Sequence, residues 1–378
     1  MSKGTDKYIV GKVHRFDQKK EMFKRAVWDA KWQDVRKRAY ASPRYPKGKD
    51  GYKLEDLAFF NAAWYIEDAF AAGTVIHNTG MYKWDTVPGY QSQVPRDVKL
   101  KVDDPQKVSR KIKKVARFFG ASLVGISELD KRWIYSHSFN RDSGEHEELE
   151  IPEEFKYAIV LVFEMDYELV KMTPKWLCDA TEGKGYSTMP FTAAMLAQFI
   201  RNLGYKAIPT GNDTALSIPL AIDAGLGELG RNGLLITEEF GPRVRIAKVL
   251  TDLPLAPDES CDFGVLKYCS RCEKCARYCP SQAIIYGERT DKPHNISNNS
   301  GELKWPIDAE KCLSFWARNE GSCMTCIRVC PFNKPSGWFH RFVRWLIKLN
   351  ISWLDSFLVK MDDLFGYGKQ ANAGKYWN

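Results

Sequence analysis

Hydrophobic and polar positions follow a helical period in the first clearly patterned segment of the chain, residues 104–120. The segment starts at Asp104-Pro105, which is typical of an N-cap followed by a first helical residue, and it stops at Gly120. Apolar side chains recur on one face, at Val108, Ile112, Val115, Ala116 and Phe119. This spacing predicts an amphipathic helix.

Short apolar runs follow this helix and predict a series of strands. The expected strands cover residues 121–126, 159–163, 205–208, 234–237 and 244–250, and further helices cover 193–203 and 218–224. Helices that alternate with short strands favour a layered, mixed fold of the α/β (α+β) class. We place this domain at residues 104–258.

The two ends of the chain have other patterns. Residues 1–103 mix aromatic and basic residues with Pro and Gly, and they predict an irregular, partly helical extension. Residues 336–378 form an aromatic, amphipathic tail, which suits a membrane surface or a membrane partner, although packing against the protein's own core explains it equally well. On a helix, one stripe holds Arg341, Arg344 and Lys348, whereas Phe342, Trp345, Leu346 and Leu349 lie largely elsewhere.

Two cysteine arrays dominate residues 259–335. The first reads C-x2-C-x2-C-x3-C-P and the second reads C-x10-C-x2-C-x3-C-P. Such runs hold two cubane clusters in bacterial ferredoxins, where the fourth cysteine of a run ligates the other cluster. We therefore predict two [4Fe–4S] clusters: cluster 1 on Cys269, Cys272, Cys275 and Cys330, and cluster 2 on Cys279, Cys312, Cys323 and Cys326.

Zinc binding and disulfide bonds are the alternative uses of these cysteines. A zinc site does not require the doubled run, and a chain of 378 residues does not need disulfides for stability. Cys178 and Cys261 lie outside both arrays and are expected to be unligated thiols. Two clusters alone change no substrate bonds, so we expect the preceding domain to hold an electron acceptor.

The net charge of +9 comes from 56 basic and 47 acidic residues. No basic stretch interleaves with stacking aromatics as in RNA- or DNA-binding motifs, so we expect no nucleic-acid partner. An acidic electron donor or an anionic membrane surface suits this charge equally well. No run approaches the roughly 20 apolar residues of a membrane-spanning helix, and the N-terminus has no twin-arginine leader. We expect a cytoplasmic protein, or one whose leader has been removed.

The glycines of residues 225–230 match the dinucleotide motif G-x-G-x-x-G, but their predicted surroundings do not. That motif requires a preceding strand and a following helix, whereas here a helix precedes and a strand follows. We interpret these glycines as positions of close backbone approach to a bulky group. The six histidines follow no metal-ligand spacing, so a histidine-ligated metal is not expected.

Several of these motifs together resemble the corrinoid-dependent reductive dehalogenases, a family that shares its core with epoxyqueuosine reductase. The resemblance covers the chain from residue 104 through the tail. It rests on both cysteine arrays, on Gly185-Tyr186-Ser187, and on residues 203–216, 221–236, 241–245 and 365–368.

The resemblance implies a nitroreductase-like core that buries a base-off, cobalamin-type corrinoid, at which an organohalide loses halide by two-electron reduction. The family's catalytic tyrosine falls on Tyr186, its neighbouring asparagine on Asn212 and its arginine on Arg245. In this hypothesis Tyr186 donates a proton, Arg245 stabilises the phenolate, and Asn212 orients the phenol or binds the departing halide. The pocket tryptophans would be Trp316 and Trp84, and the corrinoid would contact Gly225, Gly227, Gly230, Asn232 and Gly233.

The resemblance also implies partners and a location. The partners would be an external low-potential electron donor and a small membrane-anchor subunit, and the protein would form a homodimer. If a twin-arginine leader was removed, it would lie on the outer face of the cytoplasmic membrane. Two alternatives stay open. Epoxyqueuosine reduction on tRNA would favour a carboxylate in place of Tyr186, and a non-catalytic electron-transfer subunit would contain iron but no cobalt.

Overall fold

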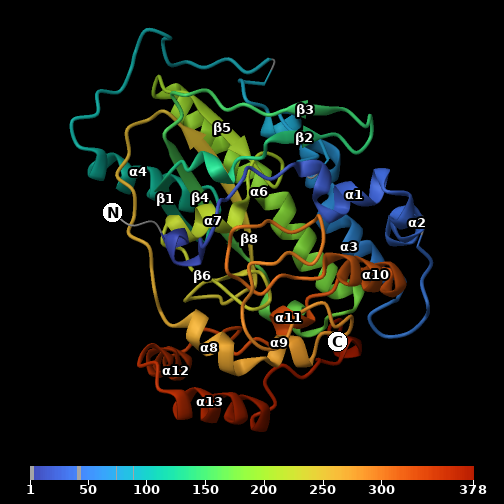
Figure 1. Ribbon diagram of the computed structural model, residues 1–378. Coiled ribbons are helices and arrows are strands. Elements are labelled where there is room, and N and C mark those ends of the chain that lie inside the picture. Colours follow the sequence, from blue (N-terminus) through green and yellow to red (C-terminus); the bar gives the residue numbers. More distant parts are fainter. Residues whose placement is uncertain (1–3, 41–43, 74, 88) are drawn as a thin grey trace.

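The computed structural model describes residues 4–40, 44–73, 75–87 and 89–378. Its centre is a four-stranded antiparallel sheet with the order β1-β4-β8-β5 (Figure 1). The strands are β1 Leu123–Glu128, β4 Tyr157–Glu164, β5 Ala207–Thr210 and β8 Val244–Thr251. The four strands expected in this region are confirmed with small shifts at their ends, and the antiparallel pairing makes the fold α+β.

Both faces of this sheet are covered. Helices α4 (Pro105–Phe118) and α6 (Trp176–Asn202) pack on one face, and α7 (Ser217–Asp223) packs on the other (Figure 1). Along β4, Ile159 and Leu161 join the first core, whereas Ala158 and Val160 join the second. A strand that is buried on both faces needs apolar side chains at successive positions, which explains the continuous apolar run.

Helix α6 is much longer than the sequence predicts, because the expected helix covered only 193–203 whereas α6 begins at Trp176. Gly183, Gly185 and Pro190 lie inside it and obscure its first half. A Cβ at Gly183 would lie 2.3 Å from Cδ1 of Trp64. Glycine in a helix costs about 0.5–1 kcal/mol relative to alanine, and here it permits close packing against the N-terminal region.

The N-terminal extension is partly helical, as expected, and it packs closely on the core. It contains α1 (Met22–Trp28), α2 (Gln33–Tyr40) and α3 (Leu54–Ile66), and α3 packs along α6. The backbone of Ile9 pairs with Glu302, and the Val10 N–H donates to the Gly301 carbonyl at 3.0 Å. Gly301 has φ +84°, and a Cβ there would lie 2.5 Å from the carbonyl oxygen of Lys12. Glycine is therefore required where the first residues meet this loop.

The remaining elements are short and surround the cysteine arrays and the sheet edge. The helices are α5 Tyr167–Lys171, α8 Val265–Cys272, α9 Lys274–Arg277, α10 Ala309–Asn319, α11 Thr325–Arg328, α12 Trp338–Lys348 and α13 Ser352–Leu364. The strands are β2 His137–Phe139, β3 His146–Glu148, β6 Glu228–Leu229 and β7 Leu235–Ile236. The glycine-rich segment 225–230 thus follows α7 and contains β6, which pairs with β7; this confirms the helix before the segment and the strand after it.

The tail forms two helices that pack on the protein through charged side chains: Arg344 in α12, and Asp355 and Asp362 in α13, which pair with Arg271 and Lys274. Arg344 is only 8% exposed and donates to the Glu239 carbonyl, and Lys348 pairs with Glu238 at 2.7 Å. The exposed side is aromatic instead; Trp338, for example, is 74% exposed. The tail is thus amphipathic: Arg344 packs against the rest of the protein, and the aromatic side chains are exposed. Within the described residues, no helix has both the length and the apolar character needed to cross a bilayer.

Candidate functional site

Three elements bring Tyr186, Asn212 and Arg245 together. Tyr186 lies on α6, Asn212 follows β5, and Arg245 lies on β8. The Asn212 Nδ2 donates to the Tyr186 hydroxyl at 3.0 Å, and the Arg245 guanidinium carbon lies 5.2 Å from the centre of the Tyr186 ring. The structure thus groups the three side chains that the family resemblance selects.

Two further residues complete this group, and the sequence analysis missed both. Trp64 of α3 stacks on the Tyr186 ring at a centroid distance of 4.9 Å. Glu182 pairs with Arg245, with 2.6 Å between Oε1 and Nη2. Glu182 precedes Tyr186 by one helical turn, a spacing that could have revealed it had the full length of α6 been predicted. Trp64 carries no such signal, because its contact joins distant parts of the chain.

Burial of Tyr186 favours its neutral phenol, whereas two of its neighbours favour the phenolate. Burial raises the pKa of Tyr186 above its usual value; the positive charge of Arg245 acts in the opposite direction, Glu182 adds to the rise, and the hydrogen bond from Asn212 lowers it. At neutral pH the phenol therefore keeps its proton. Once the proton has left, Arg245 and Asn212 stabilise the phenolate.

The loop that carries Asn212 is held from both sides. Lys248 on β8 is fully buried, contacts the Gly211 carbonyl and donates to the Ser217 hydroxyl at 2.9 Å. Burial lowers the pKa of Lys248 to about 8, and Asp213 opposes this effect. From the N-terminal extension, Gln18 donates to the Asp213 carbonyl at 3.2 Å. Asn212 is therefore positioned by contacts with residues far away in the sequence.

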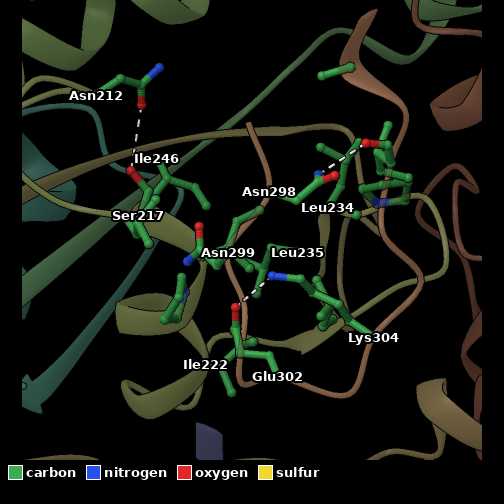
Figure 2. A pocket seen from close by; sticks show the side chains of 18 of the residues that line it. Asn212, Ser217, Ile222, Leu234, Leu235, Ile246, Asn298, Asn299, Glu302 and Lys304 are labelled. Carbon is green, nitrogen blue, oxygen red and sulfur yellow. Dashed lines mark hydrogen bonds and ion pairs between the residues drawn. The ribbon is translucent and has the colours of Figure 1, made fainter. Parts of the chain in front are cut away.

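A cavity of about 460 Å³ opens beside Tyr186. Its walls combine apolar and aromatic side chains with hydroxyl and amide groups, and Figure 2 shows many of them. The Asn212–Ser217 contact and the Lys304–Glu302 pair both belong to the lining (Figure 2). The asparagine-rich loop of residues 295–301 supplies Asn298 and Asn299 to the cavity wall.

The lining of the cavity suits a flat ligand that carries amide groups, as a corrinoid does. Its volume lies within the usual range of ligand sites, about 300–1,000 Å³. The aromatic residues Tyr8, Tyr135 and Trp305 offer flat apolar surface, and Asn298 and Asn299 offer hydrogen bonds. Among the described lining residues there is no histidine, so a corrinoid here would lack a histidine ligand from the wall.

The cysteines form two groups that fit two clusters. Cys269, Cys272, Cys275 and Cys330 line one small pocket together. In the other group, burial together with the nearby Cys323 and Cys279 raises the pKa of Cys312 to about 12. Burial and the nearby Cys323, Cys312 and Cys279 also raise the pKa of Cys326. All ten cysteines lie within the described ranges, and each is free of disulfide bonds. Eight thiols in two groups of four are the donor set that two cubane clusters need.

The two predicted pocket tryptophans do not reach the 460 Å³ cavity in this structure. Trp316 lies on α10, with its ring 5.6 Å from that of Phe23, and Trp84 lies 5.9 Å from the ring of His77. Neither belongs to the described residues that line the cavity. The described part of the chain offers no hydrogen-bond acceptor to either indole N–H. A substrate contact for them stays a prediction.

Most of the predicted corrinoid-binding residues pack against the protein itself. A Cβ at Gly225 would lie 2.2 Å from the Glu259 carbonyl oxygen, one at Gly227 would lie 2.3 Å from that of Ile236, and Gly230 also packs against Ile236. Close backbone approach therefore occurs, with the chain itself as neighbour. Gly233 lines the cavity, whereas Asn232 lines the pocket of the first cysteine group. Cofactor contacts of these residues stay predictions.

Comparisons with known proteins agree with the predicted clusters and fold. Residues 268–333 match the family model of a 4Fe-4S double cluster binding domain, which confirms the prediction of two clusters. The tetrachloroethene reductive dehalogenase of Sulfurospirillum multivorans is 39% identical over 300 residues, which are 73% of this chain and 60% of that protein. The enzyme of the same name from Dehalobacter restrictus is 40% identical over 333 residues, 78% of this chain and 60% of that protein.

More distant matches extend this picture. A solved reductive dehalogenase, described in terms of B12-dependent dehalogenation, superposes with a TM-score of 0.72 at 23% identity over 99% of this chain and 50% of that chain. At this identity it supports the fold. An epoxyqueuosine reductase from Lactococcus garvieae is 27% identical over 134 residues, 32% of this chain and of that protein.

The chain spans about three fifths of the length of the two tetrachloroethene reductive dehalogenases that it matches. Its identity to them, near 40% over at least 300 residues, covers about three quarters of the chain. The chain is a homologue of the reductive dehalogenases and carries a double [4Fe–4S] cluster domain.

Proposed function

We propose that the chain is the catalytic part of a reductive dehalogenase. It would convert an organohalide by the reaction R–X + 2 e⁻ + H⁺ → R–H + X⁻. One observation carries the proposal: a protonated Tyr186 phenol, in contact with Asn212 and Arg245, lines a large cavity of the domain that is joined to the cluster cysteines. The similarity to tetrachloroethene reductive dehalogenases supports it.

A base-off corrinoid is the group that we propose for the cavity. Ser217, Asn298 and Asn299 would hold its amide groups, and Tyr8 and Trp305 would contact its apolar surface. When bound, the corrinoid would supply the two-electron reduction of the carbon–halogen bond. The two clusters would deliver the electrons from an external low-potential donor.

The chain's own residues would control the proton. Tyr186 gives its hydroxyl proton to the carbon that loses halide, because its raised pKa keeps the proton available at neutral pH. Arg245 then stabilises the phenolate, and Asn212 keeps the hydroxyl oriented. Glu182 holds Arg245 in place through their ion pair, and Trp64 shields one face of the ring from water.

Anaerobically reconstituted protein is expected to contain one corrinoid and about eight iron atoms, and to release halide from tetrachloroethene with reduced viologen. Metal analysis, the ultraviolet–visible spectrum and ion chromatography of halide measure these quantities. Protein that loads both clusters but binds no corrinoid would overturn the proposal and favour an electron-transfer subunit.

Two cysteine variants test the ligand assignment: one removes a predicted ligand, and the other removes a thiol outside both groups as its control. Cys330→Ala should keep about four iron atoms, because it removes one ligand from cluster 1 only. Cys261→Ala should keep about eight, since this thiol belongs to neither group. An unchanged iron content in Cys330→Ala would remove Cys330 from the ligand set.

We also propose that the tail binds a membrane-anchor subunit and so attaches the protein to the cytoplasmic membrane. The relevant surface, the aromatic face of α12 and α13, consists of Trp338, Phe339, Phe342, Trp345, Leu349, Trp353, Phe357, Leu364 and Phe365. These residues are 43–75% exposed, and clustered exposed aromatics of this kind mark interaction surfaces. A homodimer, measurable by light scattering, belongs to the same proposal.

Sedimentation with membranes tests this surface. Wild-type protein should sediment with membrane vesicles that contain the anchor subunit and not with phosphatidylglycerol–phosphatidylethanolamine liposomes. A Trp345→Ser/Trp353→Ser variant should stay in the supernatant, whereas Tyr45→Ser, which changes an exposed aromatic residue elsewhere, should sediment normally. Equal binding to liposomes would indicate lipid as the partner, and no binding to either would refute the surface.

A further inference from the structure

Two histidines that are separated in the sequence meet on the β2–β3 hairpin, outside the proposed active site. The hairpin register places Phe139 opposite His146 and His137 opposite Glu148. Opposite residues and residues two positions apart share a face of a sheet, so both histidines point to the same side. Their ring centres are 4.8 Å apart.

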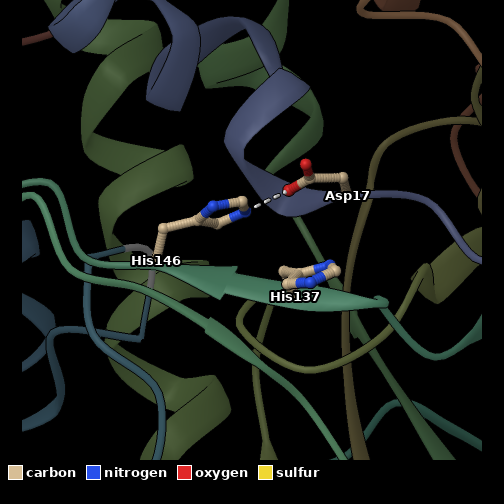
Figure 3. A group of neighbouring side chains, drawn as sticks. All are labelled: Asp17, His137 and His146. Carbon is tan, nitrogen blue, oxygen red and sulfur yellow. Dashed lines mark hydrogen bonds and ion pairs between the residues drawn. The ribbon is translucent and has the colours of Figure 1, made fainter.

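A carboxylate from the N-terminal extension completes the group. The backbone of Asp17 forms a parallel bridge with His137, and the Asp17 Oδ1 lies 3.0 Å from Nε2 of His146 (Figure 3). One ligand atom from each of the three residues lies within 4.8 Å of the other two. Figure 3 shows the three side chains converging above the hairpin, next to the first turn that follows Asp17.

We propose that Asp17, His137 and His146 bind a divalent transition-metal ion, with zinc as its probe. Two imidazoles and one carboxylate are a recurrent donor set for such ions, and tetrahedral coordination at 2.0–2.2 Å separates ligand atoms by about 3.4 Å. In the structure the three atoms lie within 4.8 Å of one another, so binding would draw the most distant of them closer together. A water molecule or Glu148, which is exposed on the same face, supplies the fourth ligand.

The surroundings hold the ligands in place. The Asp17 Oδ1 accepts the Lys19 N–H at 2.9 Å, and Nδ1 of His137 contacts the Ser136 hydroxyl at 3.0 Å. Contacts of this kind orient metal ligands and are typical of the surroundings of metal sites. The three residues come from two separate segments, so an ion would tie the N-terminal extension to the hairpin.

The proposed metal site is linked to the proposed active site through Gln18, the residue after Asp17, which contacts Asp213, the residue after Asn212. Gln18 is 2% exposed; its amide accepts the Phe139 N–H at 3.0 Å and donates to the Asp213 carbonyl at 3.2 Å. The ion therefore fixes the segment that supports the loop of Asn212. Its role is structural, and it requires neither a corrinoid nor the proposed dehalogenation.

Zinc binding to cluster-loaded protein tests the site. Protein washed with chelator and given one equivalent of zinc should retain about one zinc after desalting, and its zinc K-edge spectrum should show only nitrogen and oxygen ligands, with imidazole scattering. A sulfur shell would place the zinc on cysteines and overturn the proposal, as would a failure to retain zinc.

Matched variants locate the ion. His146→Gln and Asp17→Asn should each weaken zinc binding by more than about tenfold, because even outer contacts of metal sites typically contribute 10–100-fold. Asparagine still caps the turn after Asp17, so this variant keeps the local fold. His14→Ala, which removes an exposed histidine nearby, should bind zinc normally. Wild-type affinity in both ligand variants, or the same loss in His14→Ala, would refute the assignment. Iron content, measured in parallel, shows that each variant is folded.

Discussion

Replacing Tyr186 by phenylalanine should lower the rate of dehalogenation by about 10²–10⁴-fold, the usual contribution of a positioned acid. The substitution removes one oxygen and keeps the ring that stacks on Trp64. Corrinoid and iron contents should therefore stay unchanged. Single-turnover halide release from the reduced, fully loaded protein measures the chemical step directly.

The pH dependence gives a second measure of the same role. Catalysis needs the protonated phenol, so the rate should fall as the pH rises through the pKa of Tyr186, which burial raises above its ordinary value. Wild-type protein should thus show no loss from this group between pH 7 and about pH 10. Tyr65→Phe, which changes an exposed tyrosine beside Trp64, is the control. Full activity in Tyr186→Phe would exclude this residue as the acid.

Replacing Arg245 by glutamine should reduce both stability and activity. Glu182 is only 6% exposed, and the substitution leaves its carboxylate without the guanidinium. Breaking a buried ion pair from one side typically costs about 3–5 kcal/mol. The loss of the charge that stabilises the phenolate should also lower the rate by about 10²–10³-fold.

The double variant Glu182→Gln/Arg245→Gln separates these two effects. It carries no unpaired buried charge, so it should regain most of the lost stability while remaining as slow as Arg245→Gln. The midpoint of anaerobic guanidinium unfolding and single-turnover halide release provide the two readouts. Equal stability of wild-type protein and Arg245→Gln would show that the ion pair does not matter for folding; recovery of activity in the double variant would contradict the role of Arg245.

The parts of this protein that could be predicted are those with local signals. The cluster domain follows from cysteine spacing, which is a property of the covalent chain, and β4 follows from its apolar run. The first half of α6 was missed because Gly183, Gly185 and Pro190 disfavour a helix locally. Gly183 and Gly185 allow close packing against Trp64 and Arg245, which no local pattern reveals.

In the candidate site too, some residues could be predicted from motifs in the sequence and others could not. Tyr186, Asn212 and Arg245 were reached through motifs, whereas Trp64 and Glu182 act through tertiary contacts with them. The sequence left the orientation of the tail open, because the acceptor of Arg344, the Glu239 carbonyl, lies outside the tail. The pairing of His137 with His146 depends on the register of a hairpin whose strands the sequence analysis did not predict.

The pairing of the first residues with the loop at residues 301–303 has a consequence for the order of assembly. The Leu303 N–H donates to the Tyr8 carbonyl, so one edge of the cavity joins residues that lie almost 300 positions apart in the chain. On the ribosome, Tyr8 emerges long before its partner exists. The cavity wall can close only after residue 303 has left the ribosome, so until then this edge of the cavity stays open to a ligand.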